Sequence, residues 1–145
     1  VEYVPGRGYT GADSEMTLRE GADHIGELQA WNLDTGALEW TTNFPSLNWG
    51  SVLTTGGGLV FMGGTPDRRF SAFDAATGTE LWSKRLSSGV MGVPVTYAVD
   101  GVQYIAVQSG WGVDPASMTR RVDAARGTFT YVPQGGVLWV FALDR

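Results

Sequence analysis

Hydrophobic and polar side chains alternate in two short stretches of the chain, residues 27–32 and 69–74. A period of two is typical of a β-strand with one buried face. Each stretch runs into a turn sequence of the form Asx-x-x-Thr-Gly, in which the Asn or Asp side chain caps backbone amides and the glycine takes a positive φ. The pattern therefore predicts two hairpins, each with a second strand that ends at a tryptophan, Trp40 or Trp82.

The two predicted hairpins are copies of one another. Residues 30–40 return 42 positions later as residues 72–82, with alanine, threonine, glycine and tryptophan identical. The same offset pairs Gly50 with Gly92, and a third copy begins at Ala142. A period of about 40 to 45 residues is the size of one four-stranded propeller blade. The sequence therefore predicts an all-β fold built from β-propeller blades.

Between the copies lie short, continuous apolar runs at residues 57–63 and 103–107, as expected for inner strands that are buried on both faces. Asp100-Gly101 predicts a tight hairpin turn before the second run. No stretch has a convincing period of 3.6 residues, so the predicted helix content is low.

The chain divides into a loop region with an outer strand at 1–25 and blade segments at 26–46, 47–88 and 89–145. The last segment is longer by 28 residues, because the alanines of the second and third copies are 70 positions apart. Most of the excess lies in residues 111–134, which are predicted to form a loop. Long insertions on one face of a repeat protein often belong to the functional face, but a simple surface excursion is an equal alternative.

Composition narrows the function classes. The chain has no cysteine, which removes disulfides, thiolate zinc sites and cysteine nucleophiles. Its formal charge is −5, without a basic patch, which argues against a nucleic-acid partner. No apolar run approaches the roughly 20 residues of a membrane span. Glycine makes up 21 of 145 residues, about twice the usual share, as in many β-repeat proteins. The first residue is valine, so we expect a piece of a longer chain.

The repeat consensus Ala-x-Asp-x-x-Thr-Gly-x-x-x-Trp resembles the tryptophan-docking motif of quinoprotein dehydrogenases, eight-bladed propellers that carry pyrroloquinoline quinone (PQQ). Further segments resemble the C-terminal part of PQQ-dependent alcohol and methanol dehydrogenases; they are residues 5–12, 26–31, 48–51 and 103–112. The resemblance covers nearly the whole chain and implies about two and a half of the eight blades. In this family the motif tryptophans pack between blades, so it implies structural roles for Trp40 and Trp82.

The resemblance implies an enzyme of the bacterial periplasm that oxidises an alcohol to an aldehyde and passes electrons to a cytochrome c. A calcium or lanthanide ion polarises the quinone in this family, and a carboxylate base assists. Their ligands and the catalytic aspartate belong to blades outside these 145 residues, so no catalytic or metal-binding residue is expected here. The remaining blades or a second chain are the expected partners, and the chain alone is expected to be inactive. The alcohol, the ion and the direct electron acceptor stay open.

Five residues are the candidates for contact with PQQ. Trp49 and Gly50 precede a strand where the family places a tryptophan and backbone against the cofactor; the alternative for Trp49 is packing between blades. A broad indole suits a planar quinone, and a glycine lets backbone approach closely. Trp111 and Gly112 follow an inner strand at the equivalent end of the next blade, with lining of a tunnel as the alternative. Asn48 has an amide to bond a cofactor oxygen, but capping of its own turn is favoured.

Two other functions compete with a dehydrogenase. One is a non-catalytic propeller scaffold of the kind used in outer-membrane assembly, and the other is a repeat fragment that assembles with its own copies. The tryptophan-glycine segments favour the enzyme, because a scaffold has no need for broad aromatics at the ends of inner strands. The acidic stretch at 13–27 and the single histidine, His24, match no metal-site spacing and are predicted to be a solvated loop.

Overall fold

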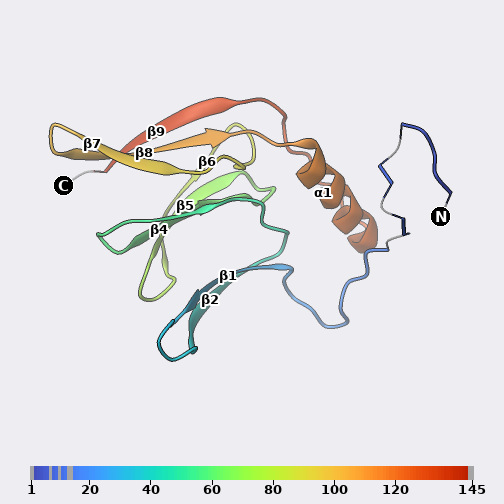
Figure 1. The fold of residues 1–145 in the computed structure, drawn as a ribbon, viewed down its shortest axis with the longest axis horizontal. Helices are drawn as coiled ribbons and strands as arrows, with labels where there is room; N and C mark the ends of the chain where they lie inside the picture. The colour runs from blue at the N-terminus through green and yellow to red at the C-terminus, as the bar shows by residue number, and fades with distance from the viewer. Residues whose placement is uncertain (1, 7, 10, 13–14, 144–145) are drawn as a thin grey trace.

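The computed structural model describes residues 1–145 except 1, 7, 10, 13–14 and 144–145. Within these described residues, nine strands form three antiparallel sheets, which lie side by side (Figure 1). The first sheet pairs β1 (Gly26–Trp31) with β2 (Leu38–Phe44). The described residues before Gly26 form turns and extended loop and contain no strand.

The second and third sheets are larger. The second has the order β3 (Val52–Thr54), β4 (Leu59–Gly63), β5 (Arg69–Asp74) and β6 (Glu80–Arg85). The third has the order β7 (Val95–Val99), β8 (Val102–Ser109) and β9 (Val137–Leu143). The apolar runs are the central strands β4 and β8, as the sequence predicts.

The repeat folds the same way in both copies. Ala30 pairs with Trp40, and Ala72 pairs with Trp82, with a register shift directly after each alanine. The strands β2 and β6 continue past these tryptophans to Phe44 and Arg85, so the prediction that they end there is wrong. The tryptophans lie mid-strand because the ladders continue beyond them, with Thr42 paired to Leu28 and Lys84 paired to Phe70.

The turn side chains act as the sequence predicts. Asn32 Oδ1 accepts hydrogen bonds from the amides of Asp34 and Thr35, at 3.0 and 3.1 Å. In the second copy Asp74 Oδ1 accepts from the amides of Ala76 and Thr77, at 3.0 and 2.8 Å. The Asp100-Gly101 turn has positive φ at both residues, 50° and 75°, as a tight hairpin turn requires.

The predicted loop at 111–134 is wrong in its first half, because residues Val113–Arg126 form the helix α1. Its buried residues are Pro115, Thr119, Val122 and Asp123. These positions have helical spacing, but only one of them carries a large apolar side chain, so no hydrophobic stripe marks the helix. Gly127 ends it in the left-handed conformation, with φ 67°.

The hydrophobic core lies between the sheets. Aromatic rings fill the space between the second and third sheets, where Phe70 stacks on Phe61 and Phe141 with centroid separations of 5.9 and 6.0 Å. Trp82 meets Phe141 edge-on at 5.1 Å. A second cluster joins the first and second sheets, formed by Leu28, Val60, Met62 and Phe73.

Trp40 connects the first sheet to the second. Its Nε1 donates a hydrogen bond to the carbonyl of Ala75 at 2.9 Å, and Thr42 Oγ1 donates to the carbonyl of Gly78 at 3.1 Å. A Cβ on Gly78 would lie 2.5 Å from the Trp40 ring, so the indole rests directly on this glycine. Both motif tryptophans therefore contact the sheet that follows their own.

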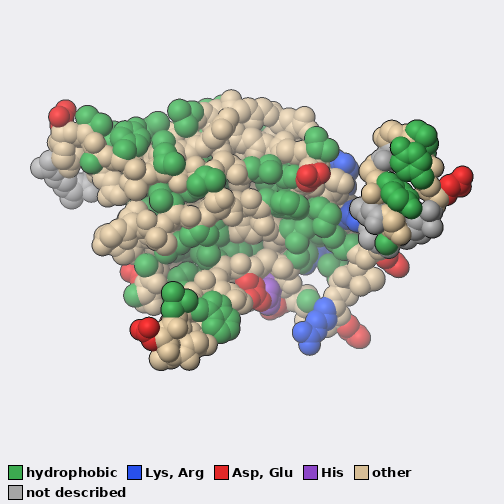
Figure 2. Space-filling model, in the orientation of Figure 1, with side chains coloured by type: hydrophobic (Ala, Val, Ile, Leu, Met, Phe, Trp, Pro, Cys, Tyr) green, Lys and Arg blue, Asp and Glu red, His purple; other side chains and the backbone are tan. Residues whose placement is uncertain are grey.

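The sheets have two distinct ends. The tight turns at 32–37, 55–58, 75–79 and 100–101 lie at one end, which we call the turn end. The connections before β3, after β4, before β7 and after β8 lie at the other end, together with α1; we call this the helix end (Figure 1). Hydrophobic side chains are also exposed over the third sheet (Figure 2), among them Val95, Tyr97, Leu138 and Val140.

Candidate functional site

The five predicted cofactor residues all lie at the helix end. Asn48, Trp49 and Gly50 precede β3 of the second sheet, while Trp111 and Gly112 follow β8 of the third. The two groups therefore occupy the same end of neighbouring sheets. In the described part of the chain, no hydrogen bond or ring contact joins one group to the other.

The Asn48 side chain is bonded within its own region. Its Oδ1 accepts a hydrogen bond from the Gly50 amide at 2.9 Å, and its Nδ2 lies 2.9 Å from the Met62 sulfur. The Trp49 amide donates to the carbonyl of Gly64 at 3.0 Å. These bonds agree with a capping role for Asn48 and fix the backbone that presents Trp49.

Gly50 allows a close approach between two backbone segments. A Cβ at this position would lie 1.8 Å from the Gly63 carbonyl oxygen, so no larger residue fits without displacing β4. The adjacent Trp49 side chain stays 36% exposed. The close backbone contact at Gly50 thus fixes the position of the neighbouring, accessible Trp49 at the end of the second sheet.

Trp111 is buried, with 5% of its surface exposed. Its ring lies against Gly89, where a Cβ would come within 2.0 Å of the indole. The backbone is held there by the Gly110 amide, which donates to the Gly89 carbonyl at 2.7 Å. The Gly112 amide, which begins α1, donates to the sulfur of Met91 at 3.1 Å.

A shallow hollow of about 490 Å³ opens beside Trp111 and Gly112. None of the residues that line it has an ionisable side chain, and half of them are glycines; they are Met91, Gly92, residues 108–112 and residues 134–136. Glycines leave flat backbone surface, and the indole and thioether supply apolar contacts. The hollow therefore offers a flat surface to one face of a planar group, but no cationic side chain.

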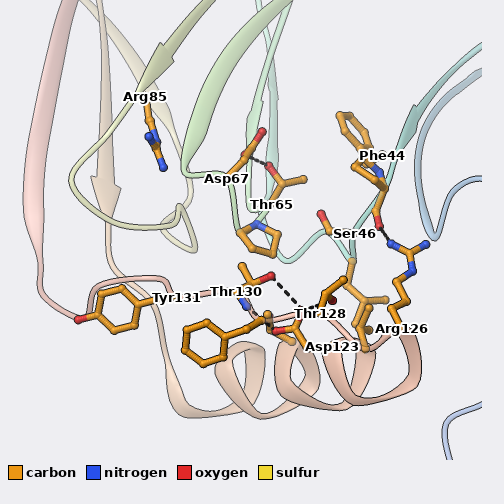
Figure 3. Close-up of a pocket in the computed structure, with 16 residues that line it drawn as sticks. Phe44, Ser46, Thr65, Asp67, Arg85, Asp123, Arg126, Thr128, Thr130 and Tyr131 are labelled. Carbon is orange, nitrogen blue, oxygen red and sulfur yellow. Dashed lines mark hydrogen bonds between the residues drawn. The ribbon is translucent and has the colours of Figure 1, made fainter.

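A second cleft, also of about 490 Å³, lies between α1 and the loops after β2 and β4 (Figure 3). The sequence did not predict this cleft, because it did not predict α1. Asp123 faces the segment that follows α1 and accepts hydrogen bonds from Thr128 Oγ1 at 2.7 Å and from the Thr130 amide at 2.8 Å. Burial raises the pKa of Asp123, but the hydrogen bonds from Thr128 and Thr130 outweigh it, so the pKa lies below its ordinary value. Arg126 donates to the carbonyl of Pro45. The helix is thus tied to the loop that leads to Trp49.

The acidic stretch forms a small hydrogen-bonded group at the start of β1. His24 Nε2 lies 2.6 Å from a carboxylate oxygen of Glu27, and Nδ1 lies 2.5 Å from one of Asp23. These bonds, first that with Glu27 and then that with Asp23, raise the pKa of His24. The residues that the structure describes contain no group of three or more His, Asp or Glu side chains arranged to hold a metal ion.

No helix within the described ranges is long and apolar enough to cross a membrane.

Comparison with known proteins gives a consistent result. The family model for the glucose/ethanol/alcohol dehydrogenase β-propeller domain, PQQ type, matches residues 41–105. A quinoprotein ethanol dehydrogenase of Pseudomonas putida is 39% identical over 99% of this chain and 22% of its own length. Subunit 1 of a methanol dehydrogenase [cytochrome c] of Methylobacterium organophilum is 34% identical over 99% of this chain and 25% of its own. The chain spans about a quarter of the length of these relatives.

Solved structures agree. A europium-containing methanol dehydrogenase is 29% identical and superposes with a TM-score of 0.68 over 85% of this chain and 24% of its own. A quinohemoprotein alcohol dehydrogenase of Pseudomonas putida HK5 is 33% identical, with a TM-score of 0.59 over 79% of this chain and 16% of its own. These likenesses confirm the predicted fold class, an all-β partial propeller, with the single described helix as an addition.

Proposed function

Because the chain belongs to the family of PQQ-dependent quinoprotein alcohol dehydrogenases, we propose that it supplies one side of the PQQ site in a propeller that oxidises an alcohol to an aldehyde. The observation that supports this role most directly is the uncharged hollow at the helix end, lined by Trp111, Gly112 and further glycines. Trp49 lies at the same end of the adjacent sheet.

The residues present fit the ring face of a planar tricyclic quinone, while cationic partners for the three carboxylates of PQQ would come from the remaining blades. The hollow of about 490 Å³ has flat glycine backbone on its surface and the buried Trp111 at its edge. The Gly112 amide already bonds the Met91 sulfur, and both polar atoms of the Asn48 side chain already have neighbours as partners. These groups would therefore contact the cofactor through their shape and apolar surface. When bound, PQQ supplies two-electron oxidation, taking a hydride equivalent from the carbon that bears the alcohol group.

The chain's own residues then bind and orient the ring system. Trp49 presents an accessible indole, and the buried Trp111 supports the edge of the hollow from behind; close contacts at Gly50 and Gly89 fix their positions. A rigid apolar wall of this kind lowers the entropic cost of holding the cofactor and excludes water from one side of it. Proton transfer to or from the substrate needs a carboxylate that the remaining blades would supply.

Other parts of the enzyme lie beyond this chain in our proposal. The remaining blades or a second polypeptide complete the propeller and provide the ligands of a calcium or lanthanide ion; a europium-containing relative supports a metal of this kind. Electrons pass to a cytochrome c, as the name of the methanol dehydrogenase [cytochrome c] subunit indicates for that relative. We place the assembled enzyme in the periplasm. The scaffold alternative is not favoured, because the relatives that cover nearly the whole chain are named as dehydrogenases.

The test is cofactor binding by the complete assembly, this chain together with the blades that complete its propeller. PQQ is titrated in the presence of calcium or a lanthanide, and binding is read from quenching of indole fluorescence and from reduction of a dye by short primary alcohols. We expect Trp49→Ala to weaken PQQ binding by about tenfold or more, since burying an aromatic side chain contributes about 1.5–3 kcal/mol. Trp111→Ala should also weaken it, because the buried indole supports the wall of the hollow. Leu81→Ala, on the outer strand β6, is the matched control and should bind PQQ normally. An intact propeller that takes up no PQQ would overturn the proposal.

A further inference from the structure

Met91 has the same place in the third sheet as Trp49 has in the second. The two residues are separated by the 42-residue repeat offset, and each is followed by a glycine, Gly92 or Gly50. Each glycine lies against a carbonyl of the next strand. A Cβ on Gly50 would lie 1.8 Å from the Gly63 oxygen, and one on Gly92 would lie 2.8 Å from that of Gln108. The local backbone arrangement is therefore repeated.

The exposure of the two side chains is also the same. Trp49 and Met91 are each 36% exposed. Both lie at the helix end, directly before the first strand of their sheet. The repeat thus presents two accessible, apolar side chains from equivalent positions on adjacent sheets.

Met91 also lies among the predicted cofactor residues. It lines the same hollow as Trp111 and Gly112, and its sulfur accepts the hydrogen bond from the Gly112 amide at 3.1 Å. This bond orients the thioether at the edge of the hollow.

We infer that Met91 is a further contact residue of the PQQ site, packing its thioether against the quinone ring system from the third sheet as Trp49 does from the second. A thioether is polarisable and makes favourable contacts with aromatic rings, and its flexible side chain adapts to the ring edge. The inference rests on the proposed function, because the ligand of the hollow is taken to be PQQ. The inference adds a residue that lies outside both tryptophan-glycine segments, residues 48–50 and 110–112.

The experiment is oxidative footprinting of the complete assembly with its native sequence, so it does not depend on the folding of a variant. The protein is treated briefly with dilute hydrogen peroxide, with and without PQQ at ten times its dissociation constant, and methionine sulfoxide is measured by peptide mass spectrometry. The chain has four methionines. Met62 is 3% exposed and serves as the buried reference, and the half-buried Met118 of α1 reports general tightening of the helix end.

We expect PQQ to slow oxidation of Met91 by about tenfold, which follows from the occupied fraction at that concentration, and to leave Met118 unchanged. Bound PQQ, shown by quenching of indole fluorescence, with no protection of Met91 would overturn the inference and leave the proposed function in place. Equal protection of Met91 and Met118 would also overturn it, since a global change would then explain the result. Absence of any PQQ binding would overturn both.

A variant series gives a second readout. Met91→Ala should weaken PQQ binding by about tenfold, as expected for loss of one buried apolar side chain, whereas Met91→Leu, which keeps much of the volume, should weaken it less. Leu81→Ala serves again as the control. Equal PQQ affinity in Met91→Ala and the native protein would count against the contact.

Discussion

Replacement of Gly78 by alanine tests how the repeat holds adjacent sheets together. Gly78 has φ 71°, and alanine in this left-handed region costs about 1–2 kcal/mol. The added Cβ would also lie 2.5 Å from Cε3 and 2.7 Å from Cδ2 of Trp40, both atoms of a rigid ring. The indole must then move and lose its hydrogen bond to Ala75, worth about 0.5–1.5 kcal/mol. We expect a total loss of about 3 kcal/mol in the free energy of unfolding.

Gly36 provides a matched control, because it occupies the same position in the first copy of the repeat. It has φ 69°, but no heavy atom lies within 4 Å of the position that a Cβ would take. Gly36→Ala in the same 145-residue chain should therefore cost only the backbone term, about 1–2 kcal/mol.

Urea unfolding followed by tryptophan fluorescence measures both variants. With a slope of about 2 kcal/mol per molar urea, Gly78→Ala should lower the midpoint by about 1.5 M and Gly36→Ala by about half as much. Equal losses in the two variants would refute the reasoning, because the Trp40 contact would then contribute nothing beyond the turn conformation.

Three further predictions concern stability and pH. Trp82→Ala removes the edge contact with Phe141 between the second and third sheets. It should lower the free energy of unfolding in urea by about 2–3 kcal/mol, which is small for loss of a tryptophan because this side chain is half-exposed. A loss below about 0.5 kcal/mol would contradict the prediction. Because the folded-state pKa of Asp123 is lowered, its stabilising contribution is present above the ordinary carboxyl pKa and is lost as the pH falls through the lowered value. Asp123→Asn should accordingly flatten the acid limb of the stability profile, and an unchanged limb would count against this. The pKa of His24 is raised, so its contribution is complete below about 6.5 and is lost as the pH rises through the raised value. An NMR titration of this single histidine should show the raised pKa, and Glu27→Gln should return the pKa toward its ordinary value. An unchanged pKa in that variant would show that Glu27 is not the cause of the shift.

The repeat was predictable from sequence because its chemistry is local. The capping side chains Asn32 and Asp74 act within five residues of themselves, and the glycines of both turns need only their own φ. The period of 42 residues then identifies the blade, since few folds repeat at that length. Strand ends were less predictable, because β2 and β6 extend past their tryptophans through cross-strand pairs, such as Leu28 with Thr42 and Phe70 with Lys84, that no local pattern marks.

The helix α1 could not be recognised from hydrophobic periodicity. It buries Pro115, Thr119, Val122 and Asp123, so its inner face carries mainly small or polar groups. A proline in the first turn and Gly127 after the last turn are the signals that were present. The cleft beside α1 was missed with it, because Asp123 is satisfied by Thr128 and Thr130, which become its neighbours only once the helix has formed.

Glycine shows why the candidate site was only partly predictable. In a sequence, a glycine beside an aromatic residue indicates that something approaches the backbone closely, but not what approaches. At Gly50 the structure places the carbonyl of Gly63 there, so this glycine positions Trp49 by bringing two strands together. Gly92 has the same contact with the carbonyl of Gln108. The residue before each glycine is therefore the one whose side chain is accessible at the helix end. By this argument Met91 belongs to the proposed site, although no sequence motif includes it. The contribution of such a site to binding then depends on side chains that the repeat exposes at equivalent positions, not only on those that the family motif names.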